Sequence, residues 1–119
     1  MGFVRIQLRL QNPHDPARGE TFEGLVDTGA LVSLVPAALL ERIGLGVGWT
    51  QRFLLANGTR VERRMTTVRA EYNGRVTEVP VAFAEPGDAS VIGVTTLELL
   101  GLEVDPVRQE IRLTDLFLF

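Results

Sequence analysis

Two Asn-Gly pairs, Asn57-Gly58 and Asn73-Gly74, constrain the fold of this 119-residue chain more than any other feature. Asn-Gly favours a type I′ turn, because both central residues of that turn need positive φ angles. Runs of residues typical of strands flank each pair, and they cover residues 51–56, 59–64, 66–72 and 75–84. The pattern predicts a meander of antiparallel hairpins and therefore a largely β fold.

The N-terminal segment also has the pattern of a strand. Apolar side chains alternate with Arg and Gln from Val4 to Leu10, which is the period expected of a half-buried strand. The prolines within residues 12–16 then end this strand, and residues 22–26 are expected to form the next one. His14 is expected in this exposed loop as a solvated residue, rather than as a metal ligand or a pH-sensitive contact.

Two short segments have the features of helices. Residues 36–44 begin with Pro and end with Gly, and residues 95–101 also end with Gly. A short apolar strand over residues 90–93 precedes the second helix. A final pair of strands is expected over residues 102–104 and 108–113. The order strand, Gly, helix thus occurs in both halves of the chain, which suggests a weak internal duplication.

The composition is that of one compact domain over residues 1–119, because 45% of the residues are hydrophobic and 23% are charged, with no linker or low-complexity tract. The absence of Cys excludes a disulfide scaffold and thiolate zinc sites. A single His excludes a multi-histidine metal site within one chain. We therefore expect no metal ion and no cofactor.

The charge pattern argues against nucleic acid and membrane partners. The 12 basic residues are all Arg, and the chain has 15 acidic residues. The net charge is therefore −3, and no dense cationic surface is expected. The N-terminus alternates charged and apolar residues, unlike the apolar core of a signal peptide. No run approaches the roughly 20 apolar residues that span a bilayer. A cytoplasmic location is the resulting expectation.

Asp27 is the acidic residue least easily explained as a solvated surface charge. It follows the apolar pair Leu25 and Val26, and small residues follow it. An ionised carboxylate in an apolar setting is costly unless it is hydrogen-bonded. Gly29 lets the chain turn so that backbone amides face the carboxylate, and Thr28 offers a hydroxyl for a supporting bond. Asp27 is therefore the leading candidate for chemistry.

Residues 25–30, Leu-Val-Asp-Thr-Gly-Ala, with a hydroxyl following at Ser33, resemble the active-site loop of retropepsin-like aspartic proteases. Residues 91–93, Val-Ile-Gly, match the second signature of that family, and residues 53–62 resemble its flap hairpin. The resemblance covers residues 4–113 and is greatest to small stand-alone prokaryotic members. It implies an all-β, retropepsin-like closed β-barrel with one or two short helices and a flap hairpin.

The resemblance also implies an activity, that of an aspartic endopeptidase which works as a homodimer on extended or unfolded polypeptides. Each chain would supply one catalytic aspartate, and the two carboxylates would share a proton across a two-fold axis. One would act as general base on a water while the other acts as acid. The implied catalytic residues are Asp27, Thr28 and Gly29, and the implied substrate-binding residues are Ala30, Ala56, Asn57 and Gly58. No metal or cofactor is implied.

An alternative is a catalytically silent retropepsin-like module that binds peptides or proteins and dimerises. The intact Asp27-Thr28-Gly29 favours the protease, because a binding module has no need for a desolvated pair of acids. Two further features stay open. The apolar tail over residues 115–119 either contributes to the dimer or folds back on its own core. Trp49 either packs beneath the flap or anchors the loop after Gly48.

Overall fold

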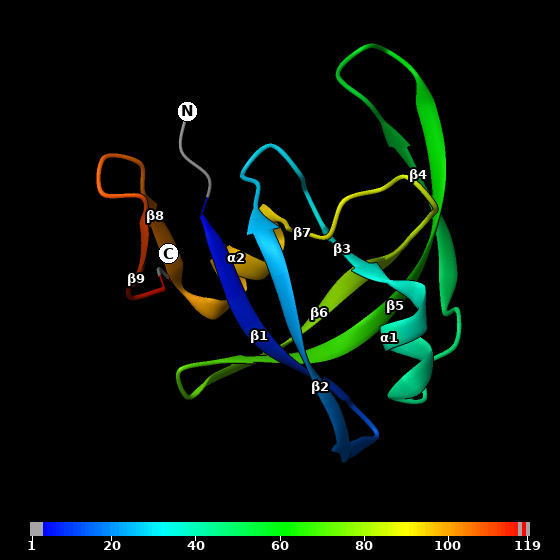
Figure 1. The fold of residues 1–119 in the computed structure, drawn as a ribbon, viewed down its shortest axis with the longest axis horizontal. Coiled ribbons are helices and arrows are strands. Elements are labelled where there is room, and N and C mark those ends of the chain that lie inside the picture. Colours follow the sequence, from blue (N-terminus) through cyan, green and yellow to red (C-terminus); the bar gives the residue numbers. More distant parts are fainter. Residues whose placement is uncertain (1–3, 117, 119) are drawn as a thin grey trace.

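The computed structural model describes residues 4–116 and 118, and within them it contains nine strands and two short helices (Figure 1). The strands are β1 (Arg5–Asn12), β2 (Asp15–Val26), β3 (Ser33–Pro36), β4 (Trp49–Leu54), β5 (Arg60–Tyr72), β6 (Arg75–Ala84), β7 (Val91–Ile92), β8 (Leu102–Asp105) and β9 (Glu110–Leu113). The helices are α1 (Ala37–Arg42) and α2 (Val94–Leu100). The predicted all-β class with one or two short helices is confirmed. Within the described residues, neither helix has the length and apolar character needed to cross a membrane.

Six of the strands close into a ring. The order in the large sheet is β1-β2-β7-β3-β6-β5-β4, and β1 also pairs with β5. Closure leaves the paired strands of the ring without a free edge. Strand β4 lies outside the ring, where it pairs with β5 alone, so the β4–β5 hairpin extends beyond the ring (Figure 1).

Apolar side chains that alternate along the strands fill the interior of the ring. In β1 the buried apolar residues are Ile6, Leu8 and Leu10, as the period-two pattern predicts. Helices α1 and α2 add Leu40 and Leu97 to the same cluster. The cluster also contains Phe22, Val35, Val68, Val79, Phe83 and Ile92. One continuous core therefore supports both helices and the ring.

The second strand begins earlier than the sequence predicts, at Asp15 rather than at residue 22. Pro13 lies in the turn between β1 and β2, and Pro16 lies beside a register shift in the ladder that joins them. A proline is tolerated at such an irregularity, because the ladder needs no backbone donor there. His14 is exposed in the turn, as expected.

The two Asn-Gly turns differ from each other. Asn73 and Gly74 have φ angles of 48° and 85°, which confirms the type I′ turn between β5 and β6. The other turn is wider than predicted, because Gly58 has a φ of 85° while Asn57 is not in the positive-φ region. The Gly58 amide donates to the Leu55 carbonyl (2.9 Å), as in a three-residue loop that ends in a left-handed glycine.

One long strand, β5, follows this loop where the sequence predicts two. The sequence predicts two strands over residues 59–64 and 66–72, but β5 runs without a break through a buried Met65. Its first part pairs with β4, from Arg60 opposite Leu54 to Met65 opposite Trp49. Its second part pairs with β6, beginning at Met65. The hairpin is thus continuous with the ring through β5.

Both predicted helices are present. Helix α1 is shorter than the predicted range 36–44, because Pro36 still belongs to β3 and precedes the helix as its N-cap. Gly44, with a φ of 87°, then redirects the chain. Helix α2 ends at Gly101, whose φ of 68° gives the left-handed C-cap that the sequence indicates.

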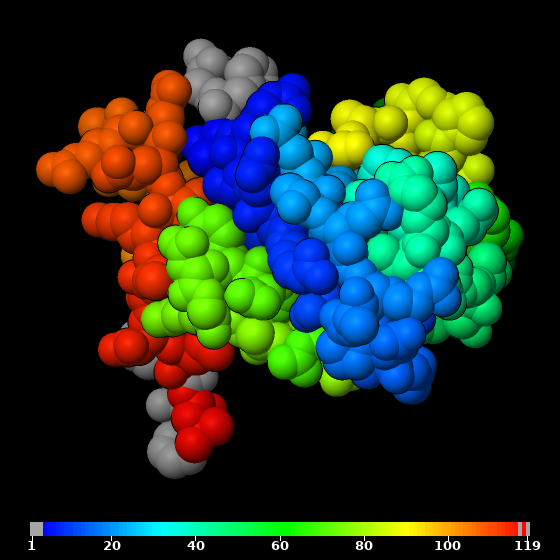
Figure 2. Space-filling model, turned by 60° about the horizontal axis from the view of Figure 1, so that its bottom comes forward, coloured from blue at the N-terminus to red at the C-terminus, as the bar shows by residue number. Residues whose placement is uncertain are grey.

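The C-terminal strands form a separate two-stranded sheet, as predicted. Strand β9 starts later than expected, because the Val107 and Arg108 amides both donate to Asp105 Oδ1 within the turn. Figure 2 shows this hairpin projecting from the side of the molecule, with the C-terminal segment below it. Leu118 is 88% exposed, so the described part of the tail does not fold back on the core. Residues 117 and 119 of that predicted tail lie outside the described residues.

Candidate active site

Asp27 directly follows the last residue of β2. Its amide donates to the Ile92 carbonyl (3.0 Å), which continues the parallel pairing of β2 with β7 by one residue. Asp27 Oδ1 accepts a hydrogen bond from the Gly29 amide (2.9 Å), so a backbone amide of the turn faces the carboxylate as the sequence predicts, although Gly29 is not in the positive-φ region. The apolar setting predicted for Asp27 is not found in one chain, because the residue lies past the strand end and is exposed.

Thr28 and Ala30 complete this turn. The Ala30 amide donates to the Asp27 carbonyl (3.1 Å), which closes the turn around the carboxylate. Thr28 is exposed, and in the described part of the chain its hydroxyl makes no hydrogen bond. The predicted bond from Thr28 to the carboxylate is therefore absent within a single chain.

The first turn of α2 is hydrogen-bonded to the loop that follows Asp27. The Val94 amide donates to the Ala30 carbonyl (2.8 Å), and the Thr95 amide donates to the Leu31 carbonyl (3.0 Å). The first amides of a helix have no partner within the helix, so they are available for such bonds. Helix α2 thereby fixes the path of the loop.

A buried pair of hydroxyl groups adds a second connection. Ser33 Oγ accepts a hydrogen bond from the Gly93 amide (3.0 Å) and lies 2.7 Å from Thr96 Oγ1. Both side chains are almost fully buried. Sequence reasoning noted Ser33 and Gly93 within motifs without giving either a role, and it missed Thr96. The available signal was the spacing of Thr96 and Leu100, which are four residues apart and so share the apolar face of the short helix.

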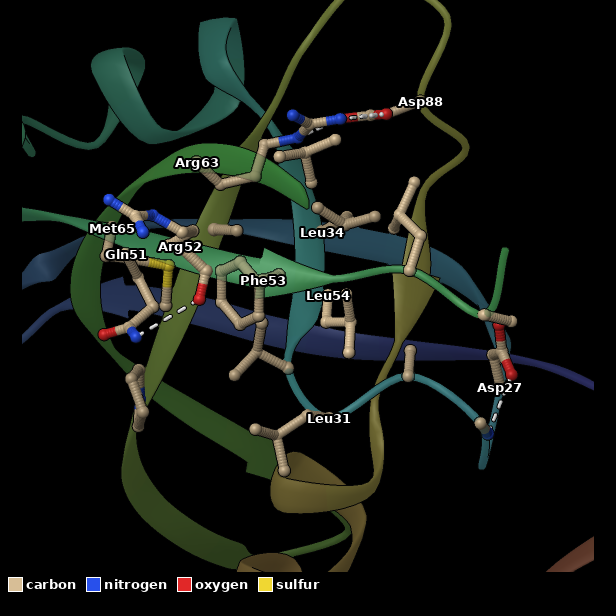
Figure 3. Close-up of a pocket in the computed structure, with 18 of the residues that line it drawn as sticks. Asp27, Leu31, Leu34, Gln51, Arg52, Phe53, Leu54, Arg63, Met65 and Asp88 are labelled. Atoms are coloured by element: carbon tan, nitrogen blue, oxygen red, sulfur yellow. Dashed lines mark hydrogen bonds and ion pairs between the residues drawn. The ribbon is translucent and has the colours of Figure 1, made fainter. Parts of the chain in front are cut away.

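A groove of about 830 Å³ lies between the loop after Asp27 and the β4–β5 hairpin (Figure 3). Most of its lining is apolar. The lining residues are Asp27, Gly29, Ala30, Leu31, Val32, Leu34, Trp49, Gln51, Arg52, Phe53, Leu54, Leu55, Ala56, Val61, Arg63, Met65, Pro80, Ala82 and Asp88. Four of the seven predicted site residues are thus in the groove. Thr28, Asn57 and Gly58 are exposed outside it.

The inner face of the hairpin carries alternate residues of both strands. The directly opposed pairs Trp49 and Met65, Gln51 and Arg63, and Phe53 and Val61 all line the groove. Opposed residues of antiparallel strands point to the same face, so the hairpin presents an aromatic and aliphatic surface that one polar pair, Gln51 and Arg63, interrupts. Trp49 is the first residue of β4 and lines the groove at the base of the hairpin, where it stays 41% exposed, next to the bond from the Gly48 amide to the Met65 carbonyl.

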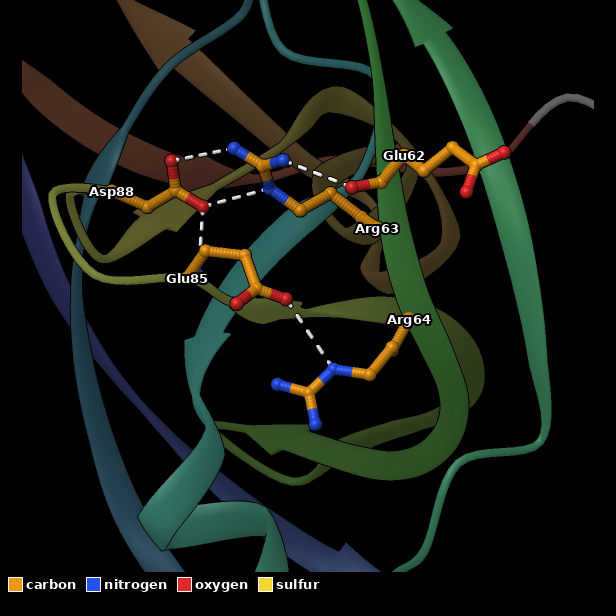
Figure 4. Close-up of polar contacts among 5 residues, drawn as sticks. All are labelled: Glu62, Arg63, Arg64, Glu85 and Asp88. Carbon is orange, nitrogen blue, oxygen red and sulfur yellow. Dashed lines mark hydrogen bonds and ion pairs between the residues drawn. The ribbon is translucent and has the colours of Figure 1, made fainter.

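One ion pair stands at the edge of this apolar groove. Arg63 Nε and Nη2 donate to the two carboxylate oxygens of Asp88, each at 2.8 Å, and Asp88 also accepts from the Glu85 amide (Figure 4). The guanidinium of Arg63 holds the pKa of the Asp88 carboxyl below its usual value. Asp88 in turn raises the pKa of Arg63, so both groups are charged at neutral pH.

Among residues 4–116 and 118, acidic side chains and His do not gather in groups of three or more that could hold a metal ion. Two carboxylates line the groove, those of Asp27 and Asp88. Asp88 is committed to Arg63, so Asp27 is the carboxylate of the groove that is available to act on a ligand.

Comparisons with known proteins identify a family and a fold. The family model described as aspartyl protease matches residues 17–104. The EIAV protease complexed with the inhibitor HBY-793 superposes with a TM-score of 0.63 at 20% identity, over 87% of this chain and 93% of that one. A retropepsin-like aspartic protease from Rickettsia conorii gives a TM-score of 0.52 at 13% identity, over 88% and 89% of the two chains. No curated protein matches the sequence.

A third similar structure belongs to a larger protein. The foamy viral protease-reverse transcriptase in complex with an RNA/DNA hybrid gives a TM-score of 0.54 at 18% identity, over 89% of this chain and 14% of that one. At these identities the three structures establish the fold, which is retropepsin-like. The chain belongs to the aspartyl protease family.

Replacing Ser33 with Ala is expected to lower the free energy of unfolding by about 1–3 kcal/mol, because the Gly93 amide and the Thr96 hydroxyl lose a partner in a dry core. Urea denaturation measures the change. Ser90→Ala is the matched control, since Ser90 is only half-buried and its hydroxyl makes no hydrogen bond in the described residues. Equal destabilisation by the two substitutions would contradict the assigned role of Ser33.

The ion pair of Asp88 predicts a pH dependence. Because its pKa is lower in the folded chain than in the unfolded one, the pair stabilises the fold fully above a pH of about 4, and this stabilisation is lost as the pH falls through the folded-state pKa. The difference in unfolding free energy between the protein and an Asp88→Asn variant should shrink correspondingly. Urea denaturation from neutral to acidic pH tests this, and a constant difference would refute it.

Proposed function

We propose that this protein is an aspartic endopeptidase that acts as a homodimer and hydrolyses peptide bonds of extended polypeptides. The single observation that carries the proposal is the exposed Asp27 carboxylate, held by the Gly29 amide at the end of an apolar groove. Membership of the aspartyl protease family supports the reaction class.

The need for a second chain follows from the contents of the groove. The reaction needs one carboxylate to take a proton from the attacking water and a second carboxyl group to protonate the carbonyl oxygen, so two acids must lie close together. Asp88 cannot be the second acid, because its two oxygens are bound by Arg63. Two copies of Asp27 meeting on a two-fold axis would supply the pair, and each would lose the solvent that surrounds it in a single chain. Contact with the partner would also give the Thr28 hydroxyl an acceptor.

The chemistry then needs one proton shared by the two Asp27 carboxyl groups. The ionised carboxylate takes a proton from the bound water as the water oxygen attacks the carbonyl carbon, and the protonated carboxyl gives its proton to the carbonyl oxygen. The tetrahedral intermediate collapses when the C–N bond breaks: the carboxyl that took the proton of the water gives it to the leaving nitrogen, and the other carboxylate takes a proton from a hydroxyl of the intermediate as the new carbonyl forms.

The substrate would bind as an extended strand under the hairpin. Among the described residues, one edge of strand β4 has no strand partner, and an extended peptide can add to such an edge through main-chain hydrogen bonds. Gly29 and Ala30 line one wall of the groove, and Ala56 lies where β4 leads into the hairpin tip. Asn57 and Gly58 form that tip and would close over the peptide.

Replacing Asp27 with Asn is expected to abolish cleavage of denatured casein, because neither a general base nor an acid remains at that position. Gel electrophoresis of digests over acidic to neutral pH measures the loss, with pepstatin as an independent inhibitor. Glu20→Gln serves as a control, since it removes a carboxylate far from the groove. An active Asp27→Asn variant would sink the assignment, and an inactive parent protein that still binds casein would favour the silent binding module.

Mixing the parent protein with the Asp27→Asn variant tests the dimer. If each active site takes one Asp27 from each chain, mixed dimers lack one acid. After exchange of subunits with an equal amount of variant, the activity should fall to about half, because about half of the parent chains then sit in mixed dimers. An equal amount of an inert protein should leave the activity unchanged. Full retention of activity after complete exchange would rule out the shared site.

A further inference from the structure

We propose that Arg63 and Asp88 are positioning residues that hold the base of the β4–β5 hairpin against the turn over residues 85–88, and so fix the height of the hairpin above the groove. This inference rests on the proposed function for its effect on catalysis. Its structural part, the placement of the hairpin, can be measured without any cleavage. Neither residue is assigned a chemical step.

The pair lies where the hairpin leaves the ring. The ladder between β5 and β6 begins at Met65, opposite Ala82, so the residues of β5 before Met65 pair only with β4. Arg63 and Arg64 are the last two residues before that ladder, and the turn they contact directly follows the end of β6. The side-chain contacts therefore continue the attachment of β5 beyond the point where the backbone ladder stops.

The two arginines contact the same turn in different ways. Neighbouring residues of a strand point to opposite faces, and here both side chains reach back to the turn, Arg63 to Asp88 and Arg64 to Glu85 (Figure 4). Arg63 and Asp88 line the groove, whereas Arg64 and Glu85 do not. Arg64 lies instead over the ring of Phe83, with its guanidinium carbon 5.2 Å from the ring centroid.

The pair in the groove is the stronger of the two contacts. Arg63 and Asp88 are only 20% and 17% exposed, and they are joined by two parallel hydrogen bonds. Arg64 and Glu85 are 42% and 36% exposed and share one bond of 3.3 Å. Bidentate, partly buried pairs resist screening by salt, whereas exposed pairs contribute little.

All the polar atoms of the inner pair are engaged. Arg63 Nη1 donates to the Glu62 carbonyl (2.9 Å), while its other two donors bind Asp88. Asp88 Oδ2 accepts in addition from the Glu85 amide (2.9 Å), so the turn itself is held in shape. Loss of either side chain leaves a partly buried charge without its partner, which loosens the turn and the hairpin together.

Loosening the hairpin would weaken substrate binding more than chemistry. Phe53 and Trp49 lie on the same inner face of the hairpin as Arg63, so their distance from a bound peptide depends on where the base is held. Asp27 is held separately, by Gly29 and the loop that α2 supports. Removal of the pair should therefore raise KM and leave kcat nearly unchanged.

The test compares Asp88→Asn with Glu20→Gln, which breaks a similar two-bond pair with Arg42 on a remote and exposed surface. Trp49 is the one tryptophan of the chain and lies at the base of the hairpin, so its fluorescence reports on this region directly. Acrylamide quenching of Trp49 should increase in Asp88→Asn and stay unchanged in Glu20→Gln. For a casein-derived peptide, KM should rise by about five- to tenfold in Asp88→Asn alone.

Two further variants keep the test decisive. Arg63→Lys retains the charge but loses the planar fork, so it should increase quenching of Trp49 even if Asp88→Asn fails to fold. Asp88→Glu retains the carboxylate and should restore part of the parent behaviour. Unchanged quenching in both Asp88→Asn and Arg63→Lys would overturn the proposal. A parent protein that cleaves nothing would refute the proposed function, while the quenching arm would still decide the role of the pair.

Discussion

The close approach of Gly93 to Val32 is the constraint on which the site depends. A Cβ atom at position 93 would lie 2.5 Å from both the carbonyl carbon and the oxygen of Val32, so only glycine allows α2 to lie this near. This approach lets the Gly93 amide donate to Ser33 Oγ. It also lets the first two amides of α2 donate to the carbonyls of Ala30 and Leu31. The loop that presents Asp27 is therefore braced by a segment more than sixty residues away in the chain.

Much of the fold could be predicted from local rules, and the failures occur where distant contacts override them. The alternation in β1, the Asn73-Gly74 turn and the Gly101 cap depend only on neighbouring residues, and each is found as predicted. The early start of β2 depends on β1 tolerating an irregular register beside Pro16. The unbroken β5 depends on Met65 being covered by both β4 and β6, which no local pattern reveals.

The candidate site shows the same division. The bond from the Gly29 amide to Asp27 spans only two residues, so a local pattern could predict it. The exposure of Asp27 could not be foreseen, because the apolar residues before it signal burial while the strand ends one residue earlier. The contact of Arg63 with Asp88 joins residues 25 positions apart, and neither has a sequence pattern that distinguishes it from the other charged residues.

Because β4 lies outside the closed ring, the residues that stabilise the fold and the residues that would contact a peptide lie largely in different parts of the chain. The ring and its core carry the stability of the chain, while the hairpin carries most of the side chains that would meet a peptide. Substitutions at exposed hairpin positions such as Gln51 or Leu54 cost the core nothing, since none of these side chains belongs to it. Under the proposed function, descendants of such a chain could therefore change the peptides they recognise while the scaffold beneath is conserved.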